Sequence, residues 1–106
     1  MKPKMYVLFR KFSDGKLIAF FPFESYYSQS WWKECDSYME NEQYCSAKIE
    51  LIKKLKKVDV SEYQQLLHEI TNIYDDYNIV VLHRYEMSNA MCLRKMDAEQ
   101  RSLVMA

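Results

Sequence analysis

The chain has 106 residues, of which 49% are hydrophobic and 15% aromatic, with a single glycine and two prolines. This composition excludes a disordered or low-complexity chain, and the length predicts one domain, which we assign to residues 1–85 with a tail over residues 86–106. Fifteen Lys and Arg residues balance fifteen Asp and Glu residues, so the net charge gives no global attraction to nucleic acid, membranes or acidic substrates.

Two apolar segments on either side of Asp14-Gly15 predict a β-hairpin over residues 6–23. A two-residue type I′ turn needs a positive φ at both central residues, which Asp and Gly tolerate. Such a turn fixes which residues lie opposite each other. The expected pairs are Phe12 with Leu17, Arg10 with Ala19 and Leu8 with Phe21 on one face, and Lys11 with Ile18, Phe9 with Phe20 and Val7 with Pro22 on the other.

Both faces of this hairpin are largely apolar. We therefore expect a helix to cover one face and a further segment or a partner to cover part of the other. Pro22 cannot donate a ladder hydrogen bond, so it predicts the end of the second strand.

Residues 24–33 predict a loop with four large aromatic side chains, Tyr26, Tyr27, Trp31 and Trp32. Tyr and Trp dominate protein interfaces and can also stack on nucleic-acid bases, so the loop is the first candidate binding surface. The alternative is that the loop folds back and caps the open face of the sheet.

Weak alternation over residues 35–41 predicts a third strand at an edge of the sheet. In residues 46–58, apolar positions at three-residue intervals predict a short helical turn followed by an extended stretch. That segment carries the one dense basic cluster, which either contacts phosphate groups or forms a solvated face. The cluster consists of Lys53, Lys54, Lys56 and Lys57.

The clearest helix is predicted over residues 60–76, where an apolar stripe that runs from Tyr63 to Tyr77 faces the sheet. Asp59 and Glu62 match a capping box at its start. His68 lies opposite the stripe. Residues 79–85 are rich in β-branched residues and predict a fourth strand, which contains His83.

The C-terminal segment, residues 86–106, is rich in helix formers and methionine, and predicts a tail helix or a frayed end. Met91 and Met96 lie on its broken apolar stripe, and flexible methionine-rich surfaces adapt to partners, so the tail is the second candidate interface. Docking of the tail on the protein's own sheet, or helicity in part of it, is the alternative.

The sequence predicts no catalytic, cofactor or metal site. Cys35, Cys45 and Cys92 form an odd set that suits a reducing compartment, and together with the two histidines they lack zinc-ligand spacing. The N-terminal apolar run is too short for a signal peptide or a membrane span, so we expect a cytoplasmic protein with no membrane partner. Glycine-rich phosphate loops and hydrolase or metalloprotease motifs are absent from the sequence, and we expect a protein that is not an enzyme.

Three stretches of sequence carry a resemblance: FRKFSDGKLIAFFP, then CDSYMENEQYCSA, then SEYQQLLHEI with a following strand that ends in an Arg-Tyr pair. Over about residues 6–85 the chain resembles small proteins carried by gut-type bacteria and by their phages and mobile elements. This resemblance implies no established activity, substrate or cofactor. It implies an accessory role in such an element, such as inhibition of a host system.

The predicted fold is an α+β domain with a mostly antiparallel sheet, in ββ(β)αβ order, packed on one main helix. The leading functional hypothesis is a small non-catalytic protein-interaction module. The alternative is a nucleic-acid-binding accessory protein that uses the lysine cluster and the loop aromatics. A homodimer is compatible with both.

Overall fold

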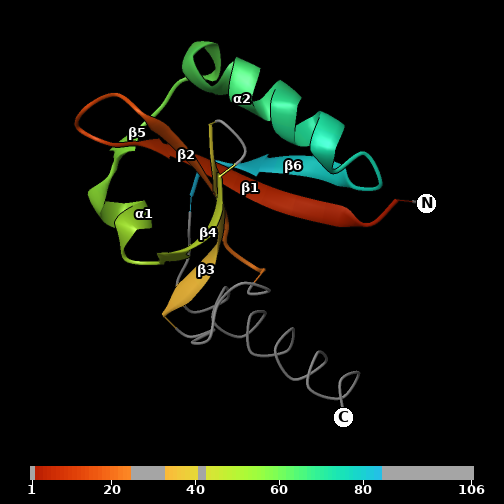
Figure 1. Cartoon of the computed structure of the whole chain (residues 1–106), viewed down its shortest axis with the longest axis horizontal. Coiled ribbons are helices and arrows are strands. Elements are labelled where there is room, and N and C mark those ends of the chain that lie inside the picture. Colours follow the sequence, from red (N-terminus) through yellow and green to blue (C-terminus); the bar gives the residue numbers. More distant parts are fainter. Residues whose placement is uncertain (1, 25–32, 41–42, 85–106) are drawn as a thin grey trace.

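The computed structural model describes residues 2–24, 33–40 and 43–84. Within these residues a six-stranded sheet carries a long helix on one face and a short helix toward the other (Figure 1). This is the α+β architecture that the sequence predicts, with a mostly antiparallel sheet and one main helix. The elements in chain order are β1 (Lys4–Lys11), β2 (Leu17–Phe21), β3 (Glu34–Met39), β4 (Gln43–Lys48), α1 (Leu51–Lys54), β5 (Lys56–Lys57), α2 (Val60–Ile73) and β6 (Asn78–Leu82).

Strand β1 lies inside the sheet and has neighbours along both edges. Its antiparallel neighbour β2 runs along one edge. Along the other edge, β6 pairs in parallel with the first part of β1, from Lys4 to Leu8, and β5 pairs antiparallel with its end, at Arg10 and Lys11. Two separate strands thus share one edge of β1 and meet end to end near Phe9.

The hairpin forms where the sequence predicts it, but its register differs by one residue. Phe12 N–H donates to the Lys16 carbonyl and Gly15 N–H to the Phe12 carbonyl, both at 2.9 Å, so the connection is a three-residue loop. Gly15 takes the left-handed conformation, with φ of 89°, that such loops place after their turn. The predicted type I′ turn is therefore wrong.

The predicted strand pairs are wrong for the same reason. Leu8 lies opposite Phe20 and Lys11 opposite Leu17. A shift of one residue moves each partner to the other face of the sheet. Pro22 follows directly after β2, as predicted.

Both faces of the hairpin are buried, as the sequence predicts, in two separate cores. The cluster on the α2 side joins apolar residues of β1, β2, β3 and α2, and within it the rings of Phe9 and Tyr63 stack at 4.4 Å. The cluster on the opposite face joins the other side of the hairpin to Cys35 and to Ile49 and Ile52 around α1. A helix and a segment of the same chain therefore cover the two faces.

Strand β3 is not the edge strand that the sequence predicts, because it pairs with β2 on one side and with β4 on the other. Its residues Cys35–Tyr38 are buried, including the polar side chains of Asp36 and Ser37. Ser37 Oγ donates to the Cys45 carbonyl at 2.9 Å, which satisfies one of these polar groups. The outer strand is β4, which the sequence analysis did not predict.

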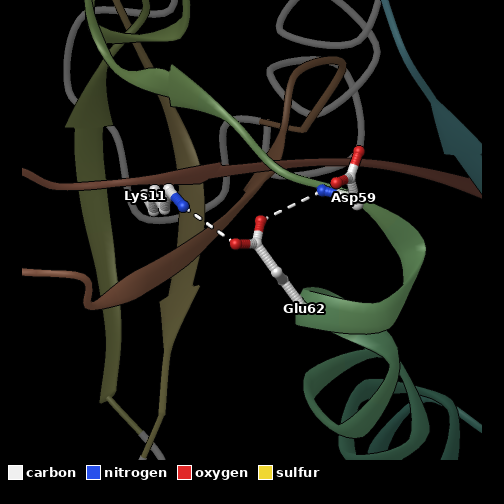
Figure 2. Close-up of polar contacts among 3 residues, drawn as sticks. All are labelled: Lys11, Asp59 and Glu62. Atoms are coloured by element: carbon white, nitrogen blue, oxygen red, sulfur yellow. Dashed lines mark hydrogen bonds and ion pairs between the residues drawn. The ribbon is translucent and has the colours of Figure 1, made fainter.

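The segment after β4 forms the predicted short helical turn, α1, and the predicted extended stretch, β5. Helix α2 starts at the predicted residue and ends at Ile73, before the predicted end at residue 76. Its start carries the predicted capping box, in which Asp59 N–H donates to Glu62 Oε2 at 3.1 Å. Glu62 Oε1 also accepts a hydrogen bond from Lys11 Nζ at 2.8 Å, so one carboxylate joins α2 to β1 (Figure 2).

The two contacts of Glu62 lower the pKa of its carboxyl group. The hydrogen bond from Lys11 is the larger cause and the backbone hydrogen bond from Asp59 the second. A lowered pKa in the folded state means that the charged carboxylate stabilises the fold above the ordinary glutamate pKa of about 4.3. This stabilisation is lost as the pH falls through the lowered value.

We expect Gly15→Ala to destabilise the protein by about 1 kcal/mol, because an alanine at positive φ is strained while the loss of glycine entropy in the unfolded chain offsets part of this cost. The space around the Gly15 Cα is open, so the cost comes from the backbone alone. Urea unfolding measures the difference. Gly15→Asn, which tolerates this conformation better, is the control and should cost less; equal stability of wild type and Gly15→Ala would contradict the observed loop.

We expect Glu62→Gln to be less stable than the wild type at neutral pH, because glutamine keeps the capping-box acceptor but loses the ion pair with Lys11. The difference should vanish as the pH falls through the lowered pKa of Glu62, where the wild-type carboxylate takes up a proton. Urea unfolding across this pH range is the measurement. Lys11→Gln should lose the part of this pH-dependent stabilisation that comes from Lys11. A stability difference between Glu62→Gln and the wild type that stays constant with pH would show that charge is not the cause.

Candidate binding surfaces

The residues of the leading interface prediction lie outside the described residues. They are Tyr26, Tyr27, Trp31, Trp32, Met91 and Met96. The four lysines of the alternative prediction are described, and all four are exposed. Lys53 and Lys54 end helix α1, and Lys56 and Lys57 form β5.

Strand β5 brings like charges together across the sheet. Lys57 lies opposite Arg10 and Lys56 lies opposite Lys11. Like charges that lie directly opposite in a sheet repel each other. Lys11 is neutralised by Glu62, whereas within residues 2–24, 33–40 and 43–84 neither Arg10 nor Lys57 has an ion-pair partner.

Arg10 is the unusual member of this group because it is buried. Its residue is 7% exposed, although it carries a positive charge. Nε donates to the Ile52 carbonyl and Nη1 to the Phe9 carbonyl, both at 2.9 Å. The Ile52 carbonyl lies in a four-residue helix and has no partner within that helix, so Arg10 caps the end of α1.

Burial lowers the pKa of the Arg10 guanidinium, because desolvation disfavours its charged form. Arginine nevertheless stays protonated in proteins. A permanently charged guanidinium therefore lies beneath α1, where two backbone carbonyls accept its hydrogen bonds. No carboxylate of the described residues pairs with it.

A pocket of about 160 Å³ opens beside Arg10, where β5 and β6 meet end to end. One part of its wall is apolar and the other is basic. The lining residues are Phe9, Arg10, Lys57, Val58, Tyr63, Val81, Leu82, His83 and Arg84. We call this the β5–β6 pocket. Sequence analysis missed Arg10, although a charged residue inside an apolar strand was a signal.

A second surface is aromatic and lies where α2 ends. The ring of Tyr74 contacts Phe21 (5.5 Å between centroids), Tyr44 of β4 (6.4 Å) and Tyr77 (6.3 Å). Tyr44 in turn contacts the buried ring of Tyr38 at 4.8 Å. We call Tyr44, Tyr74 and Tyr77 the tyrosine surface.

The tyrosine surface remains partly in contact with solvent. Tyr44 is 38% exposed and Tyr77 is 37% exposed, and the neighbouring Ile73 is 39% exposed. Sequence analysis placed Tyr77 on the apolar stripe of α2, whereas the helix ends earlier and Tyr77 follows it. Sequence analysis did not single out Tyr44, because the polar sequence of β4 did not predict a strand there.

The histidines and cysteines occupy separate positions. His68 is exposed, as predicted, and exposed His83 lies after β6 at the β5–β6 pocket. Cys35 is buried and Cys45 is exposed, and no disulfide bond joins them to each other or to another described residue. In the described ranges, no group of three His, Cys, Asp or Glu side chains is placed to hold a metal ion. Neither described helix has the length and apolar character that crossing a membrane requires.

Comparisons with protein-family models, with curated proteins and with solved structures find no match to this chain.

Proposed function

We propose that this protein is a small, non-catalytic module that acts by binding another protein. The observation that carries this proposal is the tyrosine surface. The ring of Tyr74, at the end of α2, contacts the rings of Tyr44 on β4 and of Tyr77 after the helix. Tyr44 and Tyr77 each keep more than a third of their surface exposed. Tyrosine is among the residues that contribute most to protein interfaces.

The ring contacts also prepare this surface for binding. Tyr44 and Tyr74 pack against Tyr38 and Phe21, which belong to the core. A side chain that is already ordered loses little conformational freedom when a partner binds. The aromatic rings therefore offer contact area at a low entropic cost.

The cellular setting is part of the same proposal. Among the described residues Cys35 and Cys45 form no disulfide bond, which suits a reducing compartment and favours the cytoplasm. The resemblance of the hairpin and of the segments after it favours an accessory protein of a phage or mobile element. In such an element, a module that occupies the surface of a host protein would act as an inhibitor without chemistry of its own.

We expect the double variant Tyr44→Ser, Tyr77→Ser to lose about thirtyfold or more in affinity for a protein partner captured from a host lysate. Its unfolding free energy should fall by about 1 kcal/mol or less, because both side chains are partly exposed. Affinity is measured by titration with the purified partner, and stability by urea unfolding.

The matched control is Val60→Ser, which removes an apolar side chain that is 57% exposed at the other end of α2. It should bind the partner as the wild type does. Unchanged affinity of the tyrosine variant, or an equal loss in the control, would contradict the tyrosine surface as the interface.

The lysine cluster supports nucleic-acid binding as a second candidate function. The observation that favours it is that all four lysines are exposed and that Lys57 lies opposite Arg10 across β1 and β5, which brings like charges together at a cost in stability. Lysines that contact phosphates release counterions, so binding weakens steeply as salt rises.

We expect the fourfold variant Lys53→Gln, Lys54→Gln, Lys56→Gln, Lys57→Gln to flatten the salt dependence of binding to a single-stranded oligonucleotide. Each phosphate contact that is lost should reduce the slope of log K against log salt by about 0.7. Fluorescence anisotropy at several salt concentrations measures the slope.

Its control changes four other exposed lysines of the described residues to glutamine, with the same change in net charge. These are Lys2, Lys4, Lys33 and Lys48. An equal slope in the two variants would assign any binding to net charge alone, and absence of binding by the wild type at low salt would end this candidate.

A further inference from the structure

The β5–β6 pocket is built by strands that are distant in sequence. Strand β5 runs antiparallel to β1 and β6 runs parallel to it, so their carboxyl ends approach each other near Phe9. Val58 follows β5, and His83 follows β6. Because neither strand covers this point of β1, a pocket of about 160 Å³ remains.

The charge of the pocket wall is of one sign. Arg10, Lys57 and Arg84 are cationic, and the lining residues include no carboxylate. Basic side chains gathered in this way repel one another unless a negative charge lies between them. The opposite pairing of Arg10 and Lys57 adds to this repulsion.

Arg10 is the buried member of this set of cationic residues. Its Nε and Nη1 are used by backbone carbonyls, but within the described residues Nη2 has no hydrogen-bond partner. An arginine that is 7% exposed normally pairs with a carboxylate or phosphate, because a buried charge without a counter-charge is costly.

Support of α1 alone does not account for these features. A role in capping α1 explains why Arg10 Nε donates to the Ile52 carbonyl. It does not explain why Nη2 has no hydrogen-bond partner among the described residues, or why Lys57 and Arg84 line the same pocket. An anion in the pocket accounts for all three. It would accept hydrogen bonds from the guanidinium and offset the repulsion among the cations.

We propose that the β5–β6 pocket binds one phosphate group, either as inorganic phosphate or as the phosphate of a monoester. Arg10, Lys57 and Arg84 line the pocket and supply the positive charge, and His83 lies at the same wall. The volume corresponds to roughly five water molecules at about 30 Å³ each, which leaves room for a tetrahedral oxyanion and for part of the group attached to it. Phe9 and Tyr63 form an apolar wall for that group. This site is separate from the tyrosine surface and does not rest on the proposed function.

The test is a titration followed by amide NMR at constant ionic strength, with chloride as the replaced anion. The probes are inorganic phosphate, a nucleoside 5′-monophosphate and the same nucleoside without phosphate. We expect saturable shifts at Phe9, Arg10, Lys57 and Arg84 with the two phosphate-bearing probes. Tighter binding of inorganic phosphate would identify the free anion as the ligand, and tighter binding of the monophosphate a monoester; either supports the site.

The variant Lys57→Gln, Arg84→Gln should weaken phosphate binding by about tenfold or more, because each side chain contributes a charge-assisted contact. Both residues are exposed, so the fold does not depend on them as it depends on Arg10. The matched control is Lys33→Gln, Lys48→Gln, which should bind within about twofold of the wild type. Three outcomes would overturn the proposal. They are the absence of saturable shifts in the wild type, binding of the unphosphorylated nucleoside as tight as that of the monophosphate, and equal phosphate affinity of the two double variants.

Discussion

The backbone of β1 hydrogen-bonds to β2 along one edge and to β6 and β5 along the other, while its side chains enter both cores. Helix α2 packs on one face because Phe9 points toward Tyr63. The segment around α1 packs on the other because Leu8 joins the opposite core and Arg10 holds the Ile52 carbonyl. Segments far apart in the chain therefore meet on this one strand.

Local sequence signals predicted the elements that depend on local interactions. The hairpin around Gly15, the stop at Pro22 and the capped start of α2 at Asp59 all follow from the preferences of a few adjacent residues. The register failed because Asp-Gly suits both a two-residue and a three-residue loop. Strand β4 was missed because, at the outer edge of the sheet, it has a polar composition that does not resemble a typical strand. The parallel pairing of β6 with β1 depends on tertiary packing, which local sequence does not specify.

The candidate sites also separate into those that local sequence indicates and those that arise from tertiary packing. Sequence analysis selected residues by type and density, and of these the four lysines are described and exposed. The tyrosine surface and the β5–β6 pocket instead arise from packing between distant segments, such as Tyr44 against Tyr74 and Lys57 beside Arg10. Tyr44 lies on β4 and Lys57 on β5, at opposite ends of the strand order, so the two proposed sites do not overlap.

Native-state hydrogen exchange tests the central place of β1 most directly. If the rest of the structure depends on this strand, amides of β1 that pair with β2 and β6 should exchange through global unfolding alone, with the same free energy as the whole protein. Exchange of these β1 amides through local opening, while the amides of α2 stay protected, would contradict the account.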